Sequence, residues 1–154
     1  MKLSANFNLA EFLRSAKADE LGIVLDPPEP IVDNLRSLCV DVLEPIRSLF
    51  PECRISISSG WRPVAVNVAV GGSKNSDHID GLAADFNVEG VNTYDAAMTI
   101  AKAIHTLPVK QLIYEFGRWV HVSVAAPGDI PRRQIFTARK LDGRTNYITG
   151  IVRA

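Results

Sequence analysis

The sequence QLIYEFGRWVHVSV, residues 111–124, contains two strand-like runs around a glycine and gives the strongest indication of how the chain folds. β-branched and aromatic residues are frequent in both runs, 111–116 and 119–124, as is typical of strands. Gly117 followed by Arg118 is a hairpin signal. We therefore predict two antiparallel strands joined by a tight turn.

Four other segments have strand character. RISISS (54–59) alternates polar and apolar residues like a half-buried strand, and LAADFNV (82–88) is a short apolar run suited to the interior of a sheet. QIFTA (134–138) and NYITGIV (146–152) predict peripheral strands near the end of the chain.

Three segments are predicted to be helical. Asn8 is a capping residue and predicts a short helix over about 9–17. Apolar residues recur at helical spacing through 31–49 and predict the longest helix, and a third runs from about 94 to 105. The segment 60–81 is rich in Gly, Ser and Asn and is predicted to be a loop.

The order of these elements, helices first and then strands with one helix between them, indicates an α+β fold: a small antiparallel sheet with flanking helices. The chain has 154 residues, of which 47% are hydrophobic and 22% charged. This length and composition fit one compact domain over 1–154 that buries a core.

Charge and composition exclude several classes of protein. Lys+Arg and Asp+Glu both total 17, so the formal net charge is zero, which removes the electrostatic argument for nucleic-acid binding. No apolar run approaches the ~20 residues of a membrane-spanning helix, so we expect no membrane insertion. The opening residues 1–20 lack the apolar segment of an export signal, which predicts synthesis in the cytoplasm. Cys39 and Cys53 are expected to be reduced, mostly buried thiols.

Two of the three histidines have informative neighbours. His78 precedes Asp85 by seven positions, and His121 lies in the predicted strand 119–124. A hydrolytic zinc site needs three N or O ligands and an open position for water, which two imidazoles and one carboxylate supply. Spacing alone leaves an alternative open, in which these are a loop histidine, a polar strand residue and a hydrogen-bonded sheet residue.

A longer set of motifs resembles a known family. SSGWRP (58–63), Asn67, VGGSKNSDHIDGLAADF (70–86) and WVHVS (119–123) occur in this order. Together they resemble the zinc peptidases of bacterial cell-wall peptides, the D-alanyl-D-alanine carboxypeptidases and L-alanyl-D-glutamate endopeptidases that share their fold with the hedgehog signalling domain. NFNLAEFLRS (6–15) resembles the N-terminal region of phage- and prophage-encoded members.

The resemblance implies roles for particular residues. His78, Asp85 and His121 would hold one zinc ion per chain. Arg62 matches the family arginine that faces the site and binds a substrate carbonyl or carboxylate, for which its forked donors are suited. Ser76 either orients the loop or the peptide, or caps the loop.

The general base does not match the family motif as directly as the metal ligands do. Several family members carry an acid three positions before the last histidine, or a second histidine two positions before it, where this chain has Arg118 and Trp119. The nearest upstream acid is Glu115, which we predict to be the base. The next groups to test are Asp77, Asp80 and His105.

The register of the hairpin decides whether Glu115 can act. With a two-residue loop at 117–118, Glu115 opposes Val120 and faces away from His121. With a three-residue loop and a left-handed residue, Glu115 opposes Trp119 and shares the face of His121. We expect the second register because the reaction needs a proton acceptor beside the metal.

The resemblance therefore implies zinc-dependent hydrolysis of a peptide bond in peptidoglycan stem peptides, of the D-Ala-D-Ala carboxypeptidase or L-Ala-D-Glu endopeptidase type, as in a phage endolysin. The alternative is a catalytically weak module of the same fold that binds cell-wall peptide or a protein, such as a phage structural component. We expect a monomer that reaches the cell wall after holin-type release or as part of a phage particle.

Overall fold

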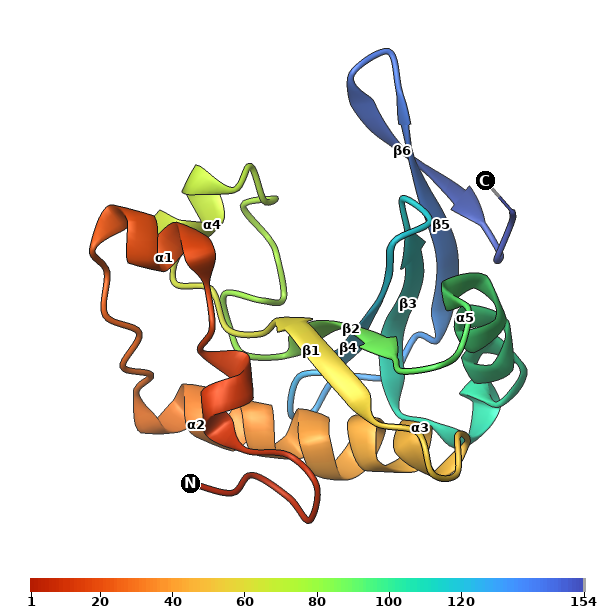
Figure 1. Ribbon diagram of the computed structural model, residues 1–154, viewed down its shortest axis with the longest axis horizontal. Helices are drawn as coiled ribbons and strands as arrows, with labels where there is room; N and C mark the ends of the chain where they lie inside the picture. Colours follow the sequence, from red (N-terminus) through yellow and green to blue (C-terminus); the bar gives the residue numbers. More distant parts are fainter. Residues whose placement is uncertain (154) are drawn as a thin grey trace.

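The computed structural model describes residues 1–153 and contains one six-stranded sheet, with helices flanking it, so the predicted α+β class is confirmed (Figure 1). Ala154, the last residue of the predicted domain, lies outside the described residues. The strand order is β1-β2-β4-β3-β5-β6. The strands are β1 (Ile55–Ser59), β2 (Ala83–Val88), β3 (Val109–Glu115), β4 (Trp119–Val124), β5 (Gln134–Leu141) and β6 (Arg144–Thr149).

One pair of neighbouring strands departs from the predicted antiparallel arrangement, because β3 and β5 are parallel. β4 ends opposite the start of β3, where Val124 pairs with Val109. The connection to β5 stays at that end of the sheet, where the Arg133 N–H donates to the Val109 carbonyl (3.0 Å). β5 therefore starts beside the start of β3 and runs in the same direction. The predicted strands 134–138 and 146–152 form the β5–β6 hairpin at the sheet edge.

The β3–β4 hairpin has the three-residue loop. Glu115 pairs with Trp119, so residues 116–118 form the turn, and Phe116 (φ 56°) and Gly117 (φ 70°) both adopt the left-handed conformation. The Phe116 N–H donates to the Ala138 carbonyl of β5 (3.0 Å). The loop is thus fixed to the neighbouring strand, and Glu115 lies on the same face of the sheet as His121.

A continuous helical rod covers one face of the sheet, over nearly the predicted range 31–49. It consists of α2 (Glu29–Ser37), a π-helical segment η2 (Leu38–Leu43) and α3 (Glu44–Ser48). Pro45 has no N–H for the carbonyl four residues earlier, and the Glu44 N–H donates instead to Cys39, five residues earlier. The proline accounts for the wider helix turn.

Two predictions of secondary structure in the N-terminal half of the chain need correction. The helix predicted over 9–17 is two elements, η1 (Leu9–Phe12) and α1 (Ala16–Leu21). The Ser15 hydroxyl accepts a hydrogen bond from the Ala18 N–H (3.1 Å) and so begins a second helix inside the predicted one.

The segment predicted as a loop, 60–81, also contains a helix, α4 (Val64–Ala69). Pro63 precedes it and has the fixed φ that suits a helix start, but the valine-rich sequence is a weak helix former and gave no signal.

The core lies between the sheet and the helices below it. Phe86, Val120 and Val122 are fully buried on this face, and α5 (Thr93–Lys102), followed by η3 (Ile104–Thr106), packs beside the rod.

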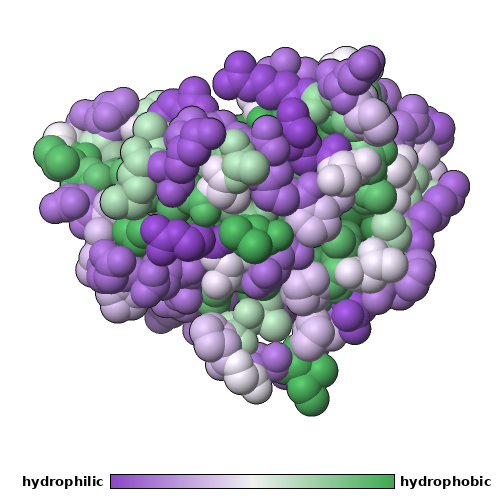
Figure 2. Space-filling model, turned by 90° about the horizontal axis from the view of Figure 1, so that it is seen from below, coloured by the Kyte–Doolittle hydropathy of each residue, from purple (hydrophilic) through white to green (hydrophobic). Residues whose placement is uncertain are grey.

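Seen from below, the outer surface of this helical side is mainly hydrophilic, with hydrophobic residues in small separate patches (Figure 2). Within residues 1–153 no helix has the length and apolar character to cross a membrane. Cys39 is buried, whereas Cys53 is half-buried.

Candidate metal centre

The face of the sheet opposite the helical rod forms the floor of a cleft of about 960 Å³. The loop 70–78 lines one side, next to α4, and the β5–β6 hairpin lines the other (Figure 1). The cleft contains every site residue that we predicted from the sequence: Arg62, Ser76, His78, Asp85, Glu115 and His121.

The three predicted metal ligands converge at the bottom of the cleft. Asp85 on β2 pairs directly with His121 on β4, and His78 reaches them from the loop. The Asp85 Oδ1 atom lies 2.8 Å from His121 Nδ1 and 3.3 Å from His78 Nε2. One ligand atom from each residue lies within 4.8 Å of the others.

The protein fixes which nitrogen of His78 faces this cluster. His78 is 2% exposed, and its Nδ1–H donates to the Gly60 carbonyl at 2.7 Å. The Nε2 atom then carries the lone pair and points toward Asp85. Backbone carbonyls orient metal-binding histidines in the same way in zinc sites.

Burial and the mutual attraction of the three groups shift their pKa values. Burial lowers the pKa of His78, and Asp85 opposes only part of this effect. For His121, burial would lower the pKa, but the hydrogen bond and charge of Asp85 outweigh it and raise the pKa. Burial would raise the pKa of Asp85, but the two histidines outweigh it and hold that pKa below its usual range. The carboxyl group is therefore ionised, as a metal ligand must be.

This donor set fits a divalent metal. Two imidazole nitrogens and one carboxylate oxygen are ligands that zinc takes in hydrolytic sites, where a fourth position stays open. A buried carboxylate between two imidazoles is also a costly arrangement that an ion would stabilise. His78, Asp85 and His121 are the residues that could hold the ion.

Neighbouring residues brace the loop that carries His78. The Arg62 N–H donates to the His78 carbonyl (3.0 Å), and the Ser76 hydroxyl accepts from the His78 N–H (3.3 Å). Asn67 is buried and donates to the Ser73 carbonyl (2.9 Å). A Cβ on Gly72 would lie 2.2 Å from the Asn67 Oδ1 atom, so any side chain at this position would displace the buried Asn67 amide.

The Arg62 side chain lines the cleft beside this loop. Its Nη2 lies 3.5 Å from the Ser76 hydroxyl, and its Nε is buried without a hydrogen-bond partner among residues 1–153. Burial lowers the pKa of Arg62, while the charges of Asp85 and Glu115 oppose that shift, which places the guanidinium in the field of both acids. It has donors left for a ligand.

Glu115 lies next to the cluster, as the three-residue hairpin loop requires. Its Oε1 is 3.7 Å from His121 Nδ1, and its Oε2 accepts a hydrogen bond from Trp119 Nε1 (3.1 Å). Burial raises the pKa of Glu115, although His121 opposes the shift. The carboxylate is held at the edge of the candidate metal centre with one oxygen facing the histidine.

The other candidate proton acceptors are less well placed. Asp77 lines the cleft, but its carboxylate is bound by Lys110 at 2.8 Å. Asp80 and His105 are exposed and do not line the cleft. Among these four candidate proton acceptors, Glu115 is therefore the one closest to the three ligands.

Sequence reasoning missed one wall of the cleft. It treated the last two strands as peripheral, yet they contribute side chains that line the cleft: Phe136, Lys140, Thr145 and Tyr147. The alternation of β5 and β6 could place these residues on one face, but it did not indicate which face or which neighbouring strand.

Comparison with known proteins agrees with the geometry. A search of curated proteins found no match to the chain. A family model described as Peptidase M15 matches residues 5–123, well over half of the chain, which confirms the family resemblance and shows that the chain belongs to this family of peptidases.

Proposed function

We propose that this protein is a zinc metallopeptidase that hydrolyses a peptide bond in peptidoglycan stem peptides. The observation that carries the proposal is the convergence of His78 and His121 nitrogens on one Asp85 oxygen, with the Glu115 carboxylate 3.7 Å from His121 Nδ1. Membership of the Peptidase M15 family supports the reaction class, and the resemblance of the motifs supports the cell-wall substrate.

The residues of the cleft have distinct roles in this proposal. His78, Asp85 and His121 would hold zinc, which when bound polarises the scissile carbonyl and lowers the pKa of water. Glu115 accepts the proton of the attacking water at Oε1, the atom that faces His121, and passes it to the leaving amine. Trp119 holds the other oxygen of Glu115 and so fixes the direction of the carboxylate.

Arg62 binds negative charge on the substrate. Its buried Nε lacks a partner among the described residues, and its guanidinium can form paired hydrogen bonds with a carboxylate or with developing charge on a carbonyl oxygen. Ser76 positions this arginine and the His78 loop through its hydroxyl.

The test is turnover of purified peptidoglycan sacculi. Chelation should abolish the release of fragments, and added zinc should restore it. His121→Ala should remove activity and bound metal, whereas His105→Ala changes an exposed histidine outside the cleft and should keep both. Sacculi from which the zinc-loaded protein releases neither peptide fragments nor a terminal amino acid would contradict the proposal and favour a binding module of the same fold.

The same experiment separates the two reaction types and the proposed phage role. An endopeptidase cuts stem peptides and solubilises sacculi, so turbidity falls. A carboxypeptidase releases a terminal amino acid and leaves turbidity unchanged. Mass spectrometry of the products identifies the bond. We favour a lytic phage enzyme because residues 6–15 resemble phage-encoded members, and that role requires the endopeptidase result.

A further inference from the structure

The β5–β6 hairpin adds a wall to the cleft that the family match does not cover. The Peptidase M15 model matches residues 5–123, and β5 and β6 follow that range. Four of the hairpin's side chains nevertheless line the same cleft as the candidate metal centre: Phe136, Lys140, Thr145 and Tyr147. The wall is thus a feature of this chain that family membership alone does not explain.

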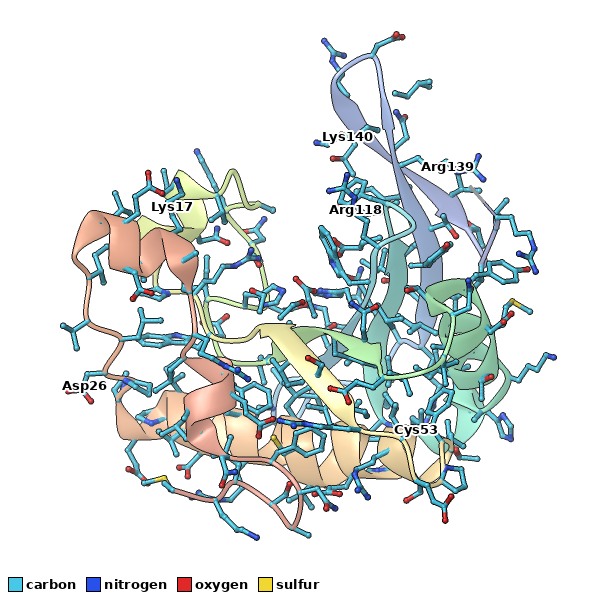
Figure 3. All side chains as sticks on the ribbon, viewed as in Figure 1. Lys17, Asp26, Cys53, Arg118, Arg139 and Lys140 are labelled. Atoms are coloured by element: carbon cyan, nitrogen blue, oxygen red, sulfur yellow. The ribbon has the colours of Figure 1, made fainter. Side chains whose placement is uncertain are left out.

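The register of the strands places these side chains beside the general base. Glu115 pairs with Ala138, and Lys140 pairs with Thr145 across the hairpin. Because alternate residues of a strand point to opposite faces, Lys140 lies on the Glu115 face and Arg139 on the reverse face. Figure 3 agrees, with Lys140 on the side of the hairpin that faces α4 and Arg139 on the far side.

Lys140 is a cation without a carboxylate partner among residues 1–153. Its Nζ donates to the Thr145 hydroxyl (3.1 Å) and lies 5.6 Å from the centroid of the Phe116 ring. No carboxylate lies within 4.0 Å of it in the described chain.

The acids that line the cleft have partners other than Lys140. Asp85 lies between two histidines, Asp77 binds Lys110, and Glu115 accepts from Trp119. None of them neutralises Lys140. The positive charge of this wall is therefore available to an anionic group of a bound molecule.

Aromatic side chains line the same part of the cleft as this cation. Phe136 packs edge to face on Tyr147 at 6.2 Å, and Phe116 packs in the same way on Trp119 at 5.7 Å. Tyr147 is 59% exposed, so a ligand can contact it. Such surfaces suit the apolar stretches of an extended peptide, while the Lys140 ammonium in the same wall suits a carboxylate side group.

We infer that the β5–β6 hairpin is a substrate-recognition wall, in which Lys140 binds a side-group carboxylate of an acidic peptide. Arg62 and Lys140 then offer positive charge on different sides of the candidate metal centre, one from the loop side and one from the hairpin. The enzyme prefers peptides with a free acidic side group to the same peptides with that group amidated. This inference rests on the proposed function, because it names the substrate class of the same site.

The test compares two synthetic stem peptides that differ only in their side-group carboxylates, which are free in one and primary amides in the other. Lys140→Glu is compared with Arg144→Glu, which makes the same change of charge on the reverse face of the hairpin, at an exposed residue that does not line the cleft. Lys140→Arg keeps the charge. Metal content is measured in each variant and should stay equal to that of the wild type.

For the free-acid peptide, Lys140→Glu should raise KM by ~10-fold, because an attraction becomes a repulsion, and should leave kcat nearly unchanged. For the amidated peptide its KM should match the wild type. Lys140→Arg and Arg144→Glu should resemble the wild type with both peptides. The KM difference should shrink at high salt.

The outcomes distinguish a failure of the proposed function from a failure of the role of Lys140. Wild-type protein that cleaves neither peptide would overturn the proposed function and this inference with it. Wild-type protein that cleaves both with equal KM would overturn the inference alone. An equal effect of Lys140→Glu and Arg144→Glu would do the same, because it would reflect overall charge and not contact within the cleft.

Discussion

Asp85 and Phe86 are consecutive residues of β2, yet they belong to opposite faces of the sheet with different tasks. Phe86 is fully buried in the core between the sheet and the helices, among apolar neighbours. Asp85 faces the cleft, where it contacts two histidines. The alternation of a strand places them on opposite faces and so separates stability from chemistry within two positions.

Burial has opposite effects on the free energy of folding at the two faces of the sheet. On the covered face, removal of apolar surface from water stabilises the fold at about 25 cal/mol per Å². On the cleft face, buried polar groups cost free energy that their mutual contacts only partly recover. Substitutions on the cleft face should therefore change function with little loss of stability, and those on the covered face should do the reverse.

The largest expected effect is on the cleft face. Asp85→Asn keeps the shape of the side chain but removes the charge between the two histidines. We expect bound metal to fall from one per chain to nearly none and peptidase activity to fall to background, because zinc sites need deprotonated ligands. Elemental analysis and turnover of sacculi check this. Full zinc content with normal activity would remove Asp85 from the ligand set.

The neighbouring substitution tests the covered face. Phe86→Ala leaves a cavity under the sheet and should lower the free energy of unfolding by ~3–5 kcal/mol. Denaturant titration measures the change. The folded fraction should still bind one metal ion, since none of the predicted ligands contributes to this face. A loss of metal without a loss of stability would show that the two faces are not separate.

The separation of faces explains what could be predicted from the sequence. Alternation in 54–59 and 119–124 located strands, and helical spacing through 31–49 located the rod, because burial on one face leaves a period in the sequence. The order of His78, Asp85 and His121 among glycines indicated the metal cluster through family resemblance. In these parts of the molecule, the pattern of residues within one segment matches the pattern of buried and exposed side chains in the fold.

The remainder depended on contacts between distant segments. The parallel pairing of β5 with β3 follows from where the loop after β4 crosses, and no local pattern encodes that position. α4 was missed because its valines are weak helix formers, and packing overrides their propensity. The register of Glu115 was decided by a left-handed Phe116, a conformation that few non-glycine residues adopt.

Glu115→Gln tests the proposed general base, which lies on the cleft face like Asp85. Metal content should remain that of the wild type, because Glu115 is not a predicted ligand, while kcat should fall by at least ~100-fold, or ~2.7 kcal/mol of transition-state stabilisation. Glu89→Gln, at an exposed acid outside the cleft, is the matched control. Near-normal turnover in the metal-loaded Gln variant would transfer the role to Asp77.

Arg62→Lys should have a smaller effect. Lysine keeps the charge but loses the two-pronged donor geometry, so kcat/KM should fall by more than ~10-fold, or ~1.4 kcal/mol, with metal content unchanged. The measurement is steady-state kinetics on one defined muropeptide. Wild-type kinetics would show that Arg62 serves only to brace the His78 loop through its backbone.

The smallest expected effect lies on the helical side, at a polar contact far from the cleft. Glu44 accepts hydrogen bonds from the Ser4 hydroxyl (2.6 Å), the Asn6 N–H (2.7 Å) and the Asn6 side-chain amide (2.8 Å), and so anchors the N-terminal segment to α3. Burial would raise the pKa of Glu44, but these hydrogen bonds outweigh it and lower the pKa. A carboxyl whose folded pKa is lowered stabilises the fold above its unfolded pKa.

Glu44→Gln should therefore lower the free energy of unfolding by ~1 kcal/mol near neutral pH, since at least one hydrogen bond to a charged oxygen is lost at a partly solvated site. The difference from the wild type should shrink as the pH falls below the ordinary glutamate value of ~4.3 and toward the lower folded pKa, where both proteins carry a neutral side chain. Thermal unfolding at a series of pH values measures it, with Glu52→Gln, at an exposed turn, as the control. Peptidase activity should not change, because Glu44 does not line the cleft. A stability difference that stays constant below pH 4 would mean that the contact acts through shape and not through charge.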